Sequence, residues 1–112
     1  MEFDLEHKDR LARLSSAAHL LRGKWVDKSE IVNLLQAVIH SGDRVCLEGN
    51  NQKQAQFLAR SLAQLDSTQI NNLHIVQSAL SLPEHISVFE KGLASRVDFC
   101  YSSGQGARLA QL

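Results

Sequence analysis

The sequence predicts an α/β fold in which helices flank a short parallel sheet of about three strands. Three short apolar runs, residues 44–47, 73–76 and 97–101, have the length of buried strands. Amphipathic helical patterns lie between these runs, and strands separated by helices form parallel sheets through right-handed crossovers. The length of 112 residues corresponds to one domain or to part of a larger one.

The first 24 residues are polar and charged, and they predict an N-terminal arm. Leu11, Leu14 and Ala18 have helical spacing within the arm, so a short helix is expected there. The main α/β domain is assigned to residues 25–112, with Trp25 expected as a packing anchor at its start.

The first helix of the main domain is expected to begin at Asp27. An acidic N-cap residue with Glu30 three positions later has the pattern of a capping box. An apolar stripe follows at helical spacing, formed by Ile31, Leu34, Leu35, Val38 and Ile39.

The next helix is expected over residues 52–65, after the first strand. Its inward side chains are predicted to be Phe57, Leu58, Ser61, Leu62 and Leu65. The polar run Asp66-Ser67-Thr68 ends this pattern.

Pro83 fits the first turn of a third helix over residues 84–94, because proline is favoured where the backbone N–H has no helical partner. Ile86, Phe89 and Leu93 would share one face of it. A loop over residues 102–106 precedes a final helical pattern that runs to Leu112 without a cap. Because a sheet of three strands is also small for this class, we expect the front portion of a longer protein.

The hinge Glu48-Gly49-Asn50-Asn51, between the first strand and its helix, is the most informative stretch. Gly49 tolerates positive φ, and free N–H groups at a helix start favour anions. One interpretation is therefore a binding site for a carboxylate, a phosphate or a thioester oxygen. The alternative is that Asn50 and Asn51 cap a helix, as asparagine often does.

Glu48 is a candidate nucleophile or general base, because a carboxylate at a strand end can be held away from water. The alternative is that it caps a neighbouring helix or pairs with an arginine. Two further loops, residues 77–82 and 102–106, are rich in Ser, Gly, Asn and Gln and would meet the hinge at the carboxyl edge of the sheet. Ligands of open α/β sheets bind at this edge.

Composition excludes several classes of function. Twelve basic and twelve acidic residues give a formal net charge of zero, which argues against binding nucleic acid or a membrane surface. No apolar run approaches the roughly 20 residues of a membrane span, and no secretory signal is present, so a cytoplasmic location is expected. The five histidines have no metal-ligand spacing, so no metal is expected, and the hinge lacks the phosphate-binding P-loop pattern.

Three residues inside apolar runs have structural interpretations. Cys46 and Cys100 are predicted to be buried reduced thiols. His74 lies within a predicted strand, as a core or sheet-face histidine.

Three segments together resemble a known family. They are GDRVCLEGNNQKQAQFLARSLAQ, NLHIVQSALSLPEHISVFEKG and RVDFCYSSGQGARLAQL. They closely resemble the front of the alpha subunit of bacterial malonate decarboxylase, and the similarity runs from about Arg10 to Leu112. That subunit is similar to the coenzyme A transferases. The resemblance implies that residues 25–112 are the N-terminal part of a three-layer coenzyme A transferase-like domain.

The resemblance also implies an activity. The family's acyl carrier protein transferase converts acetyl-S-carrier and malonate into malonyl-S-carrier and acetate. The expected partners are the acyl carrier protein, the other malonate decarboxylase subunits and malonate. No cofactor is expected to bind directly, because the reaction takes place on the coenzyme A-like prosthetic group of the carrier.

In coenzyme A transferases the first strand-to-helix loop approaches the thioester, and the hinge occupies the comparable place, so the resemblance implies Gly49, Asn50 and Asn51 as thioester-binding residues. The usual multiple-glycine pattern of that loop is missing here. The family's catalytic glutamate lies in a later part of the fold, so its role is not transferred to Glu48, and the 112 residues alone are expected to be inactive. The alternative function is a non-catalytic α/β binding or assembly fragment.

Overall fold

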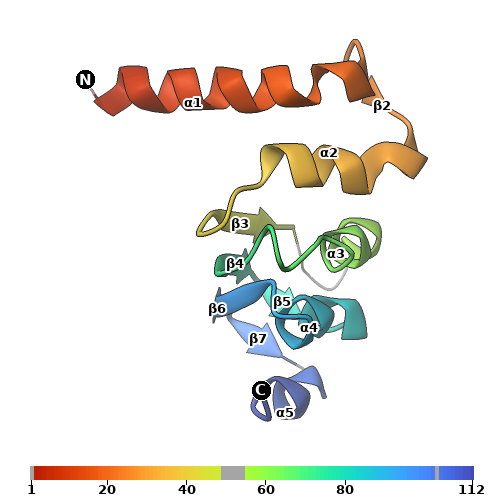
Figure 1. Cartoon of the computed structure of the whole chain (residues 1–112). Helices are drawn as coiled ribbons and strands as arrows, with labels where there is room; N and C mark the ends of the chain where they lie inside the picture. The colour runs from red at the N-terminus through yellow and green to blue at the C-terminus, as the bar shows by residue number, and fades with distance from the viewer. Residues whose placement is uncertain (1, 49–54, 103) are drawn as a thin grey trace. The chain divides into compact units, whose positions relative to one another are not determined.

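The computed structural model describes residues 2–48, 55–102 and 104–112, and it divides into two compact units, Met1–His40 and Ser41–Leu112 (Figure 1). The predicted boundary after residue 24 concerns the domains of a complete protein and stays a prediction. Among the described residues, no helix is both long and apolar enough to cross a membrane.

The first unit is built from helices α1 (Glu2–Ala17) and α2 (Ile31–Val38). A 3-10 turn, η1 (Ala18–Leu20), leads from α1 into a short antiparallel pair, β1 (Leu21–Arg22) and β2 (Trp25–Val26). The helix expected in the arm is confirmed and is longer than its apolar spacing indicated. The arm is also tied to the second helix, because the Arg13 guanidinium donates to the Val38 carbonyl oxygen over 3.1 Å.

The start of α2 agrees with the sequence in its N-cap but not in its full capping box. An Asp27 carboxylate oxygen accepts from the Ser29 N–H over 2.9 Å, which begins the 3-10 turn η2 (Lys28–Glu30) ahead of α2. The Glu30 carboxylate accepts from the Asn33 amide over 2.9 Å. Trp25 is 79% exposed, so its predicted packing role is wrong in this chain; it lies on the outer side of a two-residue strand.

The second unit contains a three-stranded parallel sheet in the order β3-β4-β6. The strands are β3 (Arg44–Leu47), β4 (Leu73–Gln77) and β6 (Ala94–Asp98). Helices α3 (Gln56–Leu62), α4 (Pro83–Glu90) and α5 (Gln105–Leu109) accompany the sheet. A separate parallel pair joins β5 (Ala79–Leu80) to β7 (Tyr101–Ser102). The predicted parallel α/β architecture is confirmed at this level.

The core of the second unit lies between the sheet and its helices. Side chains of β4 alternate, with Leu73 and Ile75 fully buried and His74 and Val76 only partly covered. The other large, fully buried side chains are Leu62, Leu80, His85, Ile86 and Leu93.

The predicted inward positions are confirmed for Ser61 and Leu62 of α3 and for Leu65 just after it, which are all buried, but they are wrong for Phe57 and Leu58. Phe57 and Leu58 are 42% and 43% exposed, whereas Ala59 and Leu62 are buried. The described helix begins at Gln56, and its small residue Ala59 lies one turn before Leu62 on the covered side. Contact with the rest of the unit, and not the largest side chains, therefore determines the helix face.

The third strand begins earlier than predicted. Gly92 adopts a φ of +78°, a left-handed conformation that glycine enters without steric cost, and α4 has ended at Glu90. Leu93 then packs into the core, and β6 runs from Ala94 to Asp98.

Both cysteines are exposed, so their predicted burial is wrong. Cys46 lies on the face of β3 that alternates with the half-buried Val45 and Leu47, and Cys100 follows the end of β6. An apolar run identifies a strand, but it does not reveal which face of that strand is covered.

Candidate functional site

The parallel strands place their carboxyl ends at one edge of the sheet. Leu47 pairs with Gln77, and Val76 pairs with Asp98, so the chain leaves β3, β4 and β6 at nearly the same level. This carboxyl edge is where α/β proteins bind their ligands.

The hinge enters the carboxyl edge directly from β3. Glu48 follows the last residue of β3 and is exposed. Gly49, Asn50 and Asn51 lie outside the described residues, so their thioester-binding role stays a prediction. The N-cap residue of α3 is Ala55, which adopts a left-handed conformation with φ +47°. The alternative in which Asn50 and Asn51 cap the helix also lies outside the described residues and stays a prediction.

Polar atoms without a partner among the described residues occur along the segment from the end of β4 to the start of α4. Gln77 is 2% exposed, and neither its amide nitrogen nor its amide oxygen has a partner among the described residues. The Ser81 hydroxyl and one Glu84 carboxylate oxygen are likewise buried without a partner in that part of the chain. Buried polar groups are normally hydrogen-bonded, so this concentration requires an explanation.

The start of α4 is held by a histidine ring. His85 is buried, and its Nδ1 accepts from the N–H groups of Ser81 and Leu82 over 3.0 and 3.2 Å. Two donors to Nδ1 leave the ring proton on Nε2. Because the side chain three residues into the helix satisfies free N–H groups at its entrance, it performs half of a capping box.

Glu84 joins the entrances of two helices. One of its carboxylate oxygens accepts from the Gln56 amide over 3.3 Å, which links the start of α3 to the start of α4. Its own backbone N–H, and next the Gln56 side chain, hold the pKa of Glu84 below its ordinary value. Glu84 therefore contributes a fixed negative charge to this edge.

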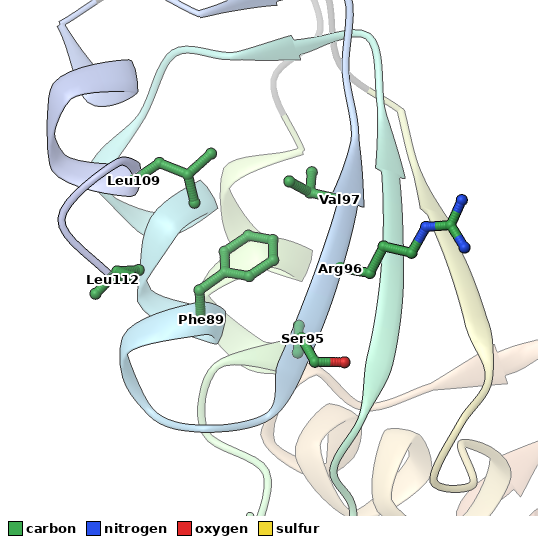
Figure 2. A pocket seen from close by; sticks show the side chains of 7 residues that line it. Phe89, Ser95, Arg96, Val97, Leu109 and Leu112 are labelled. Atoms are coloured by element: carbon green, nitrogen blue, oxygen red, sulfur yellow. The ribbon is translucent and has the colours of Figure 1, made fainter.

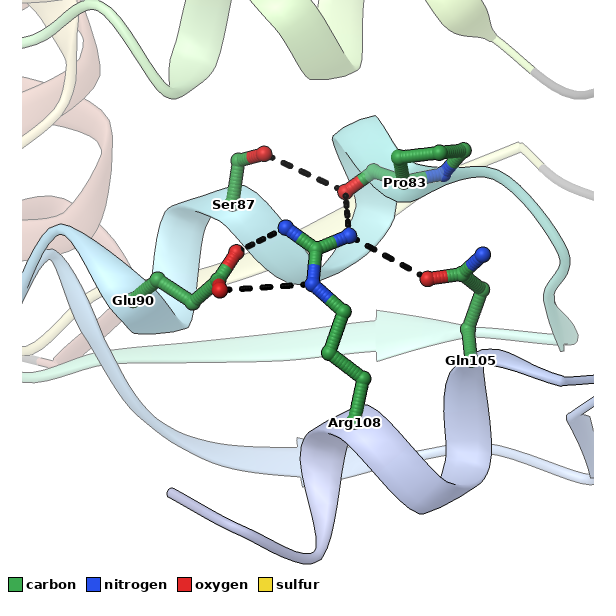
Figure 3. A network of polar contacts seen from close by, with 5 residues as sticks. All are labelled: Pro83, Ser87, Glu90, Gln105 and Arg108. Atoms are coloured by element: carbon green, nitrogen blue, oxygen red, sulfur yellow. Dashed lines mark hydrogen bonds and ion pairs between the residues drawn. The ribbon is translucent and has the colours of Figure 1, made fainter.

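A second polar group, the Arg108 network, connects α5 to α4 (Figure 3). Arg108 Nε donates to Glu90 over 3.3 Å, and its Nη2 pairs with the other Glu90 oxygen. Its Nη1 donates to the Pro83 carbonyl and to the Gln105 side chain over 3.3 and 3.2 Å. Because all of these partners come from the protein itself, the geometry indicates a structural anchor.

A cavity of about 320 Å³ lies between α4, β6 and α5 (Figure 2). Phe89, Val97 and Leu109 point toward it, while the Arg96 guanidinium points away. This mainly apolar cavity offers no cluster of polar groups for chemistry. A smaller cavity of about 210 Å³ lies at the carboxyl edge and is lined by Val76, Gln77, Ser78, Asp98, Phe99 and Cys100.

A polar row crosses the face of the sheet that carries His74. His74 Nε2 lies 2.9 Å from an Asp98 carboxylate oxygen, and Arg44 Nε donates to His74 Nδ1 over 3.4 Å. The sheet-face position predicted for His74 is confirmed. These contacts join three adjacent strands, so a structural role accounts for them. Among the described residues, no three potential metal ligands come together.

Gln77 and Ser81 belong to the loop over residues 77–82 that the sequence predicted at the carboxyl edge, although neither was singled out, and the structure adds Glu84 and His85 after that loop. A signal for Gln77 was present, because the alternation Leu73, Ile75, Gln77 places an amide on the core face of the strand. The sequence contains no comparable signal for His85, whose role depends on how the chain turns before α4.

Comparisons with known proteins agree on one family. The family described as "Malonate decarboxylase, alpha subunit, transporter" matches residues 2–112. A relative from Malonomonas rubra named "Acetyl-S-ACP:malonate ACP transferase" is 49% identical over 104 residues, which are 92% of this chain and 19% of that protein.

Two solved structures resemble this chain closely. A chain of a Pseudomonas malonate decarboxylase hetero-tetramer, in complex with malonate, matches with a TM-score of 0.94 and 39% identity, over 98% of this chain and 20% of that one. The malonate decarboxylase alpha subunit from Acinetobacter baumannii matches with a TM-score of 0.91 and 37% identity, over 99% and 20%. The chain thus spans about one fifth of the length of these relatives.

Proposed function

This chain belongs to the malonate decarboxylase alpha-subunit family, and we propose that it forms part of an acyl carrier protein transferase. The proposed reaction exchanges acetyl for malonyl on the carrier thioester: acetyl-S-carrier and malonate give malonyl-S-carrier and acetate. The observation that carries the proposal is the identity with the Malonomonas rubra transferase, which extends over almost the whole chain.

The carboxyl edge is the proposed position of the acyl group. Gly49, Asn50 and Asn51 bind the thioester in this proposal, with backbone N–H groups that stabilise the oxyanion as it develops. The resemblance to coenzyme A transferases implies carboxylate exchange through an acyl-glutamyl intermediate. That glutamate is proposed to lie in the part of a complete subunit beyond these 112 residues, with Glu48 as the candidate nucleophile within them.

The same proposal specifies the cofactor, the partners, the compartment and the complete fold. The carrier's coenzyme A-like prosthetic group brings the thioester, so no cofactor binds this chain directly. Partners are the acyl carrier protein, the other subunits and malonate, and the compartment is the cytoplasm. The complete fold is proposed to be a three-layer coenzyme A transferase-like domain, of which the described sheet is one portion.

The test uses a chimera in which this chain replaces the matching segment of the Malonomonas rubra relative. Acetate release from acetyl-S-carrier in the presence of malonate is measured for the chimera, for the unaltered relative and for the isolated 112 residues. We expect turnover by the chimera comparable to that of the relative and none by the isolated chain, which lacks the proposed position of the glutamate.

Two outcomes would change the proposal. A chimera that melts like the relative but releases no acetate supports the alternative, a non-catalytic binding or assembly segment. Turnover by the isolated chain that Glu48→Gln abolishes would make Glu48 the nucleophile.

A further inference from the structure

Gln77 is the most unusual side chain in the second unit. It ends the central strand β4 and lies on the strand face that carries Leu73 and Ile75. An apolar side chain would continue this alternation, yet a primary amide occupies the position and is 2% exposed. Its nitrogen and its oxygen both lack a partner among the described residues.

A buried amide without hydrogen bonds opposes folding, because it gives up its contacts with water and gains none. An apolar side chain of similar volume would avoid this penalty at the same position. A structural explanation for Gln77 is therefore weak, whereas a group that is completed by a ligand explains both its burial and its missing partners.

The location agrees with a ligand. Gln77 lies at the carboxyl edge, directly beside Leu47 at the end of β3, and it lines the cavity of about 210 Å³ together with Ser78. Ser81, four residues later, adds another buried polar group, a hydroxyl without a partner in the described chain. Gln77 itself thus lies at the edge at which the acyl group is proposed to bind, and Ser81 lies four residues further along the same segment.

We propose that Gln77 is a substrate-binding residue whose amide nitrogen donates a hydrogen bond to a carboxyl or carbonyl oxygen of the acyl-transfer substrates. This inference rests on the proposed function and assigns a residue to the same site. The primary amide is suited to the task, since it donates to an oxygen without adding a charge to the buried position. The ligand oxygen belongs either to the malonate carboxylate or to the thioester carbonyl.

The experiment replaces the amide by an apolar side chain of similar length, Gln77→Met, in the chimera. The matched control is Gln64→Met, which makes the same chemical change at an exposed position after the C-terminal end of α3. Melting temperature, kcat and the KM for each substrate are measured for both variants. Turnover by the chimera with Gln77 intact tests the proposed function separately.

We expect Gln77→Met to melt at the same temperature as the chimera or higher, and to lose about 10- to 100-fold in kcat/KM, the effect of one hydrogen bond to a charged group. A rise confined to the KM for malonate assigns the amide to the carboxylate. A fall in kcat, or a rise in the KM for acetyl-S-carrier, assigns it to the thioester carbonyl. Gln64→Met should change neither quantity.

Ligand binding provides a second measurement if Gln77→Met lowers stability. Malonate and acetyl-pantetheine should each raise the melting temperature of the chimera, because a ligand that binds the folded state stabilises it. Loss of either shift in Gln77→Met, with both retained in Gln64→Met, supports the proposal. Retention of both shifts, or unchanged kcat/KM for both substrates, overturns it and leaves Gln77 as a structural amide.

Discussion

The Arg108 network and the carboxyl edge differ in whether their polar groups have hydrogen-bond partners within the protein. Arg108 uses Nε, Nη1 and Nη2 on partners from α4 and α5 (Figure 3). At the carboxyl edge, both polar atoms of the Gln77 amide and the Ser81 hydroxyl lack partners among the described residues, although they are buried.

The difference indicates which polar groups serve the fold. A network that is complete within the protein makes a helix contact specific without requiring any other molecule. Buried polar groups that have no hydrogen-bond partner in the described chain are explained if a bound ligand supplies that partner. The two regions adjoin, because Pro83 accepts from Arg108 while the next residue, Glu84, belongs to the carboxyl edge.

The sharpest test of this comparison is in the hinge. Gly49→Val and Asn50→Ala in the chimera should each lower turnover about 100- to 1000-fold, the usual effect of removing an oxyanion donor, with nearly unchanged melting temperature. Asn33→Ala, at an exposed position of α2, is the control. Reduced melting with normal turnover per folded molecule would favour a capping role, since a lost cap costs about 1 kcal/mol of stability.

The second test is His85, which is a completed group within the carboxyl edge. His85→Ala removes the acceptor of two N–H groups and leaves a cavity, so the free energy of unfolding should fall by about 3–5 kcal/mol. Urea unfolding of the 112-residue chain measures this loss. His7→Ala, at an exposed position of α1, should change stability by less than about 0.5 kcal/mol. A small effect of His85→Ala would mean that the entrance of α4 is held by other contacts.

The Arg108 network should matter less, because Arg108 and Glu90 are both more than one third exposed. Arg108→Met should lower the free energy of unfolding by about 1 kcal/mol, and Arg108→Lys should lose nearly as much, because an ammonium group cannot reproduce the planar fork. Turnover of the chimera should be retained in both variants. A loss of turnover without a loss of stability would place Arg108 in the site and would contradict its assignment as a structural anchor.

The smallest expected effect is a pH dependence at a turn after α3. The Thr68 hydroxyl, followed by the Thr68 N–H, lowers the pKa of Asp66 from its ordinary 3.8. The folded chain therefore binds this proton more weakly than the unfolded chain. The stabilisation is present above the unfolded pKa and is lost as the pH falls through the lower folded value.

Urea midpoints measured from pH 7 to pH 3 test this turn. The chain should lose stability below about pH 4, and Thr68→Val should reduce that acid-dependent loss, because it removes the hydroxyl that contributes most. An identical pH profile for the two proteins would show that Asp66 does not contribute to acid sensitivity.

Several elements were predictable because their signals are local. The strands over residues 44–47 and 73–76, the turn at Asp66, the start at Asp27 and the position of Pro83 in the first turn of α4 all agree with the sequence. Each depends on a few neighbouring side chains that bond to their own backbone or alternate along it. The order of helices and strands also predicts a carboxyl edge, because the three strands of the sheet are parallel.

The sequence by itself therefore determined the parallel α/β class and the family of this protein. The tertiary structure decided which surfaces are covered: Phe57, Leu58 and the two cysteines are exposed, whereas Gln77 and His85 are buried. Burial depends on partners that are distant along the chain, and the same apolar pattern is compatible with more than one covered face. The alternation along β4 already placed the Gln77 amide on the core face, but only the tertiary structure revealed that both of its polar atoms lack a partner among the described residues.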